Sequence, residues 1–182
     1  MLSKGIFCLR RAKSFVNAKA LRNLYFSLFH SHLLYCNLIL SCLSNKNLNR
    51  ITKLQKKAIR IVTNSTYNAH TANLFQSFKI LPFEKIIYFN KLIFMHSVKY
   101  GYVHTSFQNT WQLNENRDIN YELRNTNDFA IPPPRFEGFR KYPLYSFPSA
   151  WNGIGEKALY KNRVTFKFAI RDWLFDQLVP LN

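Results

Sequence analysis

The stretch Leu48–Val62, LNRITKLQKKAIRIV, carries the clearest helical pattern in the chain. Its apolar residues recur at helical spacing and fall on one side, a pattern typical of a helix that packs one face against a core. We therefore predict a helix over this stretch. Its apolar side comprises Ile51, Leu54, Ala58, Ile61 and Val62.

Four cations occupy the opposite side of this predicted helix: Lys53, Lys56, Lys57 and Arg60, which we call the basic stripe. At 3.6 residues per turn they lie within about 100° of arc. No acidic residue stands three or four positions away to neutralise them. A charge run is usually a solvated outer face, but such faces usually mix the two signs. The stripe therefore indicates contact with phosphate groups.

The charge of the whole first half agrees with this interpretation. Residues 1–83 hold thirteen of the 26 Lys and Arg residues and none of the 9 Asp and Glu residues, in a chain of net charge +17. Abundant Lys and Asn with few Gly are typical of an AT-rich coding sequence, which explains part of the Lys count but not the missing acids. A half of one sign predicts a polyanionic partner, most commonly a nucleic-acid backbone.

The bulk composition excludes other classes. A chain that is 47% hydrophobic and 16% aromatic is not a disordered basic tail. Three cysteines at irregular spacing predict neither a disulfide framework nor secretion. The first residues do not follow the pattern of a signal peptide. We therefore expect a nuclear or cytoplasmic protein.

A second apolar stretch, residues 18–43, lacks Pro and Gly and predicts a long core helix. Part of it, Leu24–Leu43, has the length of a membrane span and no charged residue. Polar residues such as His30, His32 and Asn37 interrupt it, and basic residues flank both ends. A buried helix is the favoured interpretation, and a small basic membrane protein is an alternative.

The remaining pattern completes a mainly α fold: a small helical bundle, a loop-rich region and a C-terminal amphipathic helix. A helix is expected to begin near Pro82 and Glu84 and to end near Gly101. Residues 102–162 predict loops with a short strand or two, and an extended Pro132–Pro134 run. Thr165 is the expected N-cap of the last helix, over Thr165–Leu178. The expected division is 1–101, 102–162 and 163–182, with the last helix packing back on the bundle.

No pattern in the sequence predicts an active site. Asp172 and Asp176 stand four apart on the last predicted helix, where they balance Arg171 more simply than they bind a metal. A zinc site formed by His30, His32, Cys36 and Cys42 is disfavoured, because residues two apart on a helix, such as the two histidines, face different ways. We therefore expect neither catalytic residues nor a metal or other cofactor in this chain.

Five blocks in order nevertheless resemble the end of a non-LTR retrotransposon reverse transcriptase of the jockey-like group. The blocks are Leu24-Tyr25 through His30-Ser31-His32-Leu33-Leu34-Tyr35, Leu54-Gln55-Lys56-Lys57-Ala58-Ile59-Arg60-Ile61-Val62, His70-Thr71 through Leu74-Phe75 and Ile80-Leu81, Pro143-Leu144-Tyr145 with Trp151-Asn152, and Phe166-Lys167. The resemblance covers about residues 4–178. The chain departs from it at Asn73, where the family has Pro, and at Gly153-Ile154-Gly155, where the family has Leu-Pro.

The resemblance implies a thumb and C-terminal segment that grips a template–primer duplex. It also implies that the polymerase core, with the aspartates that hold its Mg²⁺ ions, would lie upstream of Met1. The chain would then be a noncatalytic fragment of an RNA-directed DNA polymerase whose partners are an RNA–DNA or DNA duplex and that missing core. No small-molecule substrate is implied. A transposon remnant without function is the alternative.

The predicted nucleic-acid contacts go to phosphates rather than to base edges, because Lys is a point charge and no fixed Arg or Asn array is evident. The basic stripe would make the central contacts. The cations expected to extend it are Arg50, Arg10, Arg11, Lys13, Lys19 and Arg22.

Overall fold

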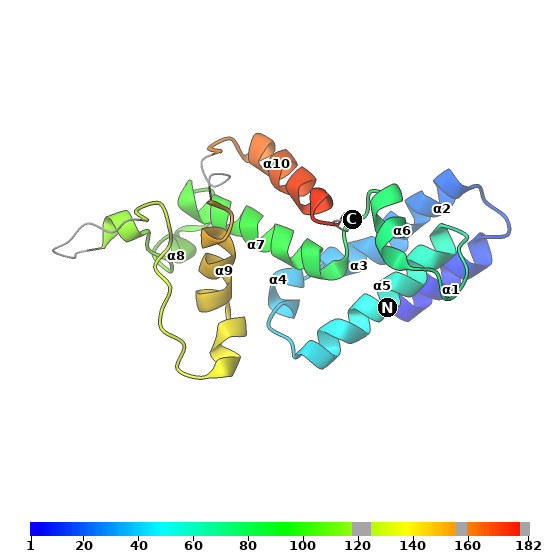
Figure 1. The fold of residues 1–182 in the computed structure, drawn as a ribbon, viewed down its shortest axis with the longest axis horizontal. Coiled ribbons are helices and arrows are strands. Elements are labelled where there is room, and N and C mark those ends of the chain that lie inside the picture. Colours follow the sequence, from blue (N-terminus) through cyan, green and yellow to red (C-terminus); the bar gives the residue numbers. More distant parts are fainter. Residues whose placement is uncertain (118–124, 156–159, 179–182) are drawn as a thin grey trace. The chain divides into compact units, whose positions relative to one another are not determined.

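The computed structural model describes residues 1–117, 125–155 and 160–178, and it is mainly α-helical as predicted (Figure 1). The chain forms two compact units. Unit 1 comprises Met1–Ile87 and the segment from Trp173 onward, and unit 2 comprises Tyr88–Asp172. Both units draw on the helix Phe83–Lys99, whereas the expected division placed that whole helix in the first domain.

Unit 1 is built from helices. In chain order these are α1 (Leu2–Ala12), α2 (Ala18–Tyr25), the π-helical turn η1 (Phe26–His30), α3 (Ser31–Leu34), α4 (Asn37–Leu40), α5 (Asn45–Val62), α6 (Thr71–Ser77) and the start of α7 (Phe83–Lys99). The longest that lie wholly within unit 1 are α1 and α5. The predictions of α5 and α7 are confirmed, although α5 begins three residues earlier than expected. The sequence interpretation did not identify α1 or α6.

The prediction of one helix over residues 18–43 is wrong in its second half. Helical backbone runs from Ala18 to Leu34 and passes through the π turn, but Tyr35 is extended and Cys36 adopts a left-handed conformation with φ of 53°. Only the short α4 follows. Apolar composition alone could not reveal this break, because neither residue is a typical helix breaker.

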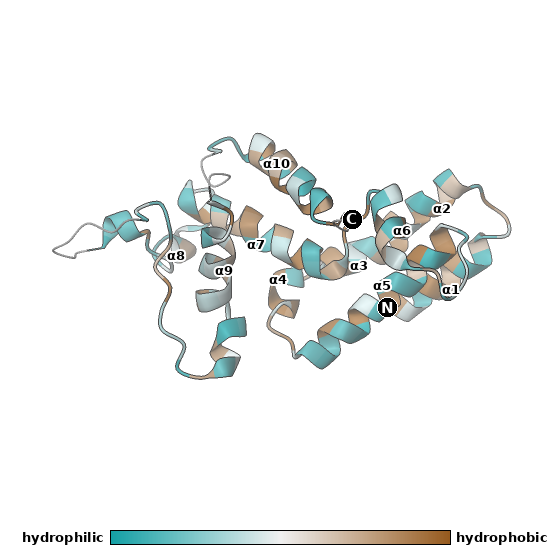
Figure 2. Cartoon of the chain, in the orientation of Figure 1, coloured by the Kyte–Doolittle hydropathy of each residue, from teal (hydrophilic) through white to brown (hydrophobic). Residues whose placement is uncertain are grey.

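The predicted apolar side of α5 is rotated slightly in the structure. Gln55, Ala58, Ile59 and Val62 are buried, whereas Ile51, Leu54 and Ile61 are half-buried at the edges of the helix. The helix packs against α1, α2 and α6, and Figure 2 shows hydrophobic residues alternating with hydrophilic ones along it. The core beneath it includes Leu9, Leu21, Tyr25, Phe29, Leu33, Phe75, Ile80 and Phe83.

A buried glutamine joins three segments of unit 1. The Nε2 group of Gln55 donates to Tyr25 Oη at 3.1 Å and to the carbonyl of Leu81 at 3.0 Å, and its Oε1 accepts the N–H of Phe83 at 2.7 Å. Phe83 is the first residue of α7, whose N–H has no partner within the helix. Gln55 therefore caps α7 from α5. Burial also raises the pKa of Tyr25, whose hydroxyl stays neutral.

Helix α1 approaches the π turn so closely that only glycine fits at position 5. A Cβ built on Gly5 would come to 2.9 Å from the carbonyl oxygen of Leu28, which is a backbone atom of η1. We expect Gly5→Ala to lower the free energy of unfolding by about 1–2 kcal/mol, because the clash outweighs the gain in helix propensity.

Chemical denaturation measures this effect. The control is Ser3→Ala on the exposed side of α1, which should be neutral or slightly stabilising. A Gly5→Ala variant as stable as that control would contradict the close approach.

Unit 2 contains the rest of α7, α8 (Thr105–Gln108), the 3₁₀ turns η2 (Asn114–Asn116) and η3 (Glu137–Lys141), α9 (Pro143–Asn152) and most of α10 (Arg163–Asp176). Trp151 of α9 is fully buried and lies 5.6 Å from the ring of Phe166 and 5.9 Å from that of Phe129. The side-chain amide of Asn152 bonds both backbone groups of Phe129, at 3.0 and 2.9 Å. These contacts attach the 125–130 segment to α9.

The prediction for residues 102–162 needs correction. In the described part of this region the β structure is a single bridge between Leu113 and Phe129, and a ten-residue helix, α9, replaces much of the expected loop. Pro143 occupies the first turn of α9, where a missing N–H costs nothing, and Pro148 lies buried inside it.

The N-cap of α10 is Asn162 rather than Thr165. Its Oδ1 accepts the N–H groups of Val164 at 2.8 Å and Thr165 at 3.2 Å. Across the described residues, none of the helices has both the length and the apolar character needed to cross a membrane.

Candidate nucleic-acid interface

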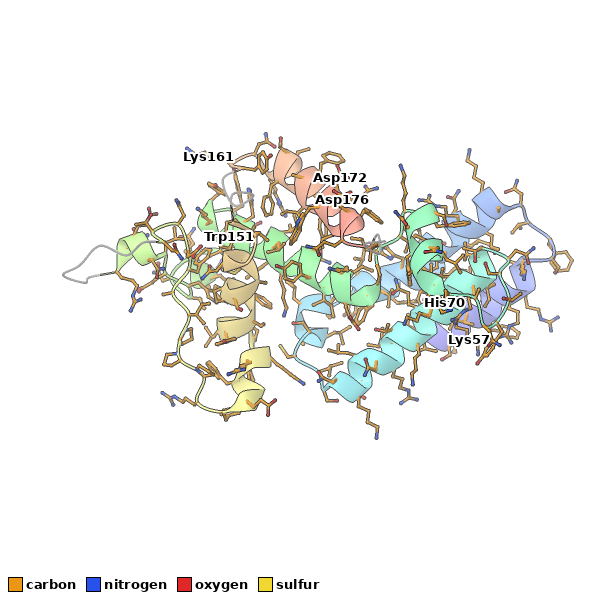
Figure 3. All side chains as sticks on the ribbon, in the orientation of Figure 1. Lys57, His70, Trp151, Lys161, Asp172 and Asp176 are labelled. Atoms are coloured by element: carbon orange, nitrogen blue, oxygen red, sulfur yellow. The ribbon has the colours of Figure 1, made fainter. Side chains whose placement is uncertain are left out.

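The three lysines of the basic stripe are solvent-exposed on α5. Lys53, Lys56 and Lys57 all lie on the side opposite the buried residues of the helix, and Figure 3 labels Lys57 there. Within the described part of the chain, none of the three has an ion-pair or hydrogen-bond partner. Since the other side of α5 is fixed in the core, the three ammonium groups extend from a rigid support.

Arg60 differs from these lysines. Its side chain is half-buried, and its Nε donates to the carbonyl of Ala69 at 3.0 Å, which attaches the 63–70 loop to α5. The guanidinium keeps its charge and retains further N–H donors. Arg60 is therefore partly a structural residue, and its replacement would disturb the loop as well as the charge.

The cations predicted to extend the stripe also comprise one half-buried arginine and several exposed side chains. Arg22 is half-buried, with its guanidinium carbon 4.8 Å from the centre of the Phe26 ring and Nη2 3.4 Å from the carbonyl of Phe78. The others are exposed: Arg50 on α5, Arg10 and Arg11 on α1, Lys13 at its end, and Lys19 on α2.

The structure brings two of these cations to one groove. Arg10 of α1 and Lys57 of α5 both line a groove of about 190 Å³ between the two helices, together with Ser3, Ile6, Phe7 and Leu54. Figure 1 shows α1 and α5 side by side. The sequence alone could not place Arg10 beside Lys57, because 46 intervening residues separate them. The pairing extends the stripe from one helix to two.

Unit 1 exposes two aromatic rings on or near α1, and the sequence interpretation did not select them. Phe7 lines the groove and is 60% exposed, and the guanidinium carbon of Arg11 lies 5.6 Å from the centre of its ring. Phe15, in the turn after α1, is 86% exposed. Solvent exposure is what distinguishes these rings from core aromatics, and the sequence does not reveal it.

Few acids oppose the charge of unit 1. Its sequence contains fourteen Lys and Arg residues against two acids, Glu84 and Asp176. Burial lowers the pKa of His30, so this side chain is neutral at pH 7 and adds nothing to the positive field. Lys and Arg side chains are therefore the main source of the positive field of unit 1 at pH 7.

The candidate metal ligands of the described residues do not gather at one place. In residues 1–117, 125–155 and 160–178 there is no cluster of three or more His, Cys, Asp or Glu side chains able to hold an ion. His32 and Cys36 are exposed, whereas His30 and Cys42 are half-buried. Asp172 and Asp176 both lie on α10 and are exposed (Figure 3).

Comparisons with known proteins give no further guide: no family model, no curated protein and no solved structure matches the chain. The fold and the basic surface therefore define only a class of protein: a mainly helical chain with a strongly basic helical surface.

Proposed function

We propose that the chain binds the phosphate backbone of nucleic-acid duplexes without reading base sequence, as the noncatalytic thumb and tail of a retroelement RNA-directed DNA polymerase. The observation that supports binding most directly is the row of Lys53, Lys56 and Lys57, exposed on a helix whose other side is buried. The blocks that resemble the reverse transcriptase family support the assignment to a polymerase.

The geometry of the surface favours backbone contact over base readout. Lysine ammonium groups on flexible stems accept many phosphate positions, and they cannot form the bidentate contacts that distinguish bases. The groove between α1 and α5 adds Arg10 beside Lys57, so two helices can contact one backbone. The expected partners are an RNA–DNA or DNA duplex and, in the parent protein, the polymerase core.

The test replaces Lys53, Lys56 and Lys57 together by Gln and leaves Arg60 unchanged, because Arg60 also attaches the 63–70 loop. Each lost phosphate contact should lower the salt slope of binding by about 0.9, so three should lower it by about 2.7. At 0.1 M salt the same loss weakens binding on the order of a hundredfold. Fluorescence anisotropy with a labelled hairpin duplex measures both quantities.

A charge-matched control removes three exposed cations elsewhere: Lys161→Gln, Arg163→Gln and Lys167→Gln. The control has the same net charge as the variant in which Lys53, Lys56 and Lys57 are replaced by Gln, which we call the stripe variant. The control should bind the duplex more tightly than the stripe variant. Equal affinities in the two variants would mean that net charge alone causes binding, and the stripe would then have no special role. A salt-independent wild-type affinity would also refute the proposal.

A further inference from the structure

Unit 2 contains an aromatic pocket formed by residues that the basic stripe does not include. A pocket of about 390 Å³ is lined by rings from two parts of the unit, with the hydroxyl residues Ser106 and Thr110 beside them. Its volume falls in the range of about 300–1,000 Å³ typical of small-ligand pockets. Its ring residues are Phe107, Trp111, Phe136, Phe139 and Tyr142.

One wall of this pocket is anchored to the core of unit 2. The rings of Phe107 and Trp111 each make an edge contact with Phe94 of α7, at 6.1 and 5.6 Å between ring centres. Trp111 also stacks on Phe147 of α9 at 6.1 Å. Trp111 is buried, whereas Phe107 remains 47% exposed.

The other wall is a cluster of three rings in η3 and at its two flanking positions. Phe136, Phe139 and Tyr142 lie 6.1–6.4 Å from one another. Phe136 rests on the backbone at Gly138, where a Cβ would come to 3.0 Å from the ring atom Cε2. Phe136 is nevertheless 58% exposed. Both walls are therefore held by packing while presenting ring surface to solvent.

Cations alternate with the rings of the second wall. Arg135 precedes Phe136 in the chain, Arg140 follows Phe139, and both arginines are exposed. Glu137 is the one acid between Pro132 and Tyr145. Ring surface alternating with positive charge is the composition of single-strand nucleic-acid sites, where bases stack on aromatics and cations hold the phosphates.

An unpartnered donor lies in the first wall. The indole N–H of Trp111 is buried and has no acceptor among the described residues. A buried donor without a partner destabilises the fold. This N–H exposes almost no surface, so a ligand in the pocket would contact the exposed rings and the neighbouring arginines instead.

We propose that this pocket binds an unpaired base of a single-stranded nucleic acid, which stacks on the exposed rings while Arg135 and Arg140 contact the flanking phosphates. The site goes beyond the proposed duplex binding, since it uses different residues, a different unit and a different feature of the ligand. A base inside a duplex presents no free face, so the pocket discriminates single strands from duplexes.

The experiment compares three labelled probes on the full chain: oligo(dT) of twelve nucleotides, an abasic oligomer of the same length, and a hairpin duplex whose loop is a base-free linker. The key variant is Phe136→Leu, which removes ring surface and keeps apolar bulk. It should bind oligo(dT) about tenfold more weakly, since stacking contributes about 1–3 kcal/mol per base. Its affinity for the abasic oligomer and the hairpin should equal that of the wild type.

A control variant and the pattern of lost binding distinguish the pocket proposal from the duplex-binding proposal. Phe168→Leu, at an α10 residue that is 56% exposed and lies outside the pocket lining, should leave oligo(dT) binding unchanged. Loss of hairpin binding only in the stripe variant supports the duplex surface, and loss of oligo(dT) binding only in Phe136→Leu supports the pocket.

Two results would overturn the pocket proposal whatever the stripe does. One is equal affinity of the wild-type chain for oligo(dT) and the abasic oligomer. The other is a proline-rich peptide whose binding is weakened by Phe136→Leu while the binding of oligo(dT) is unchanged. The pocket would then be a peptide site.

Discussion

Replacing Gln55 by Leu is expected to lower the free energy of unfolding by about 3 kcal/mol or more, because the change leaves several buried polar groups without partners. The side chain is fully buried and bonds Tyr25, Leu81 and Phe83 from a single amide. Leucine fills a similar volume, so the loss reports on hydrogen bonds rather than on a cavity. The first turn of α7 should lose order together with the contact to α2.

Urea denaturation followed by far-UV circular dichroism measures this loss. Gln76→Leu is the matched control, since Gln76 is exposed on α6, and its effect should stay within about 0.5 kcal/mol. Gln55→Glu adds a second reading: it keeps the acceptor for Phe83 but loses the donor to Tyr25 and Leu81, so it should also destabilise. A Gln55→Leu variant as stable as the control would show that the network contributes nothing.

Truncating Trp151 to Ala should cost about 3–5 kcal/mol, the usual range for a large buried aromatic. Its ring is fully buried among Phe129, Phe166 and the side chain of Lys99, whose Nζ lies 5.7 Å from the ring centre. Trp151→Phe should cost much less, because it keeps most of the ring. The indole N–H has no acceptor among the described residues, so that change loses no hydrogen bond within them.

Hydrogen exchange separates the two units in this experiment. In Trp151→Ala the amides of α9 should exchange faster, whereas those in the middle of α5 should keep their protection, because α9 belongs to unit 2 and α5 to unit 1. Phe168→Ala, at an exposed position of α10, is the control and should change neither set. Faster exchange in both helices would mean that the units unfold as one.

The two long helices, α5 and α7, were predictable because periodicity and end signals agreed. In α5 the apolar positions repeat at helical spacing, and in α7 a proline precedes the first turn and Gly101, with φ of 72°, follows the last. The exposure of Lys53, Lys56 and Lys57 follows from the same periodicity. Local pattern was sufficient for these features.

The misses have specific physical causes. Helix α1 carries its core residues Ile6 and Leu9 at helical spacing, but Gly5 in its middle argues against a helix unless a close neighbour is known. The two prolines of α9 argue for a loop, although one occupies a position that needs no N–H. The end of the 18–43 helix at Leu34 depends on the left-handed backbone of Cys36, which no local residue preference required.

Gln55 is a buried polar residue that a hydrophobic/polar sequence pattern assigns to the surface. Beside two lysines it resembles the exposed side of the helix, yet it falls on the same side as Ala58, Ile59 and Val62. That position was the available signal. Identifying its partners needed the structure, since Tyr25 and Phe83 lie 30 and 28 residues away.

Several residues that carry the resemblance to reverse transcriptases lie in the two cores. Tyr25 and Gln55 form one buried hydrogen bond, Trp151 fills the centre of unit 2, and Asn152 attaches the 125–130 segment. These blocks therefore have roles in folding that do not depend on nucleic acid. The polymerase origin is a prediction, and the stripe variant tests only the nucleic-acid binding that it implies.

Unit 1 also draws on both ends of the chain, because Leu174 is fully buried and Gln177 accepts a hydrogen bond from Lys85. Unit 1 is therefore discontinuous in sequence, with the whole of unit 2 inserted between its two segments. Removing the residues from Trp173 onward would consequently uncover part of the core of unit 1, although the helices of that unit lie far away in the sequence.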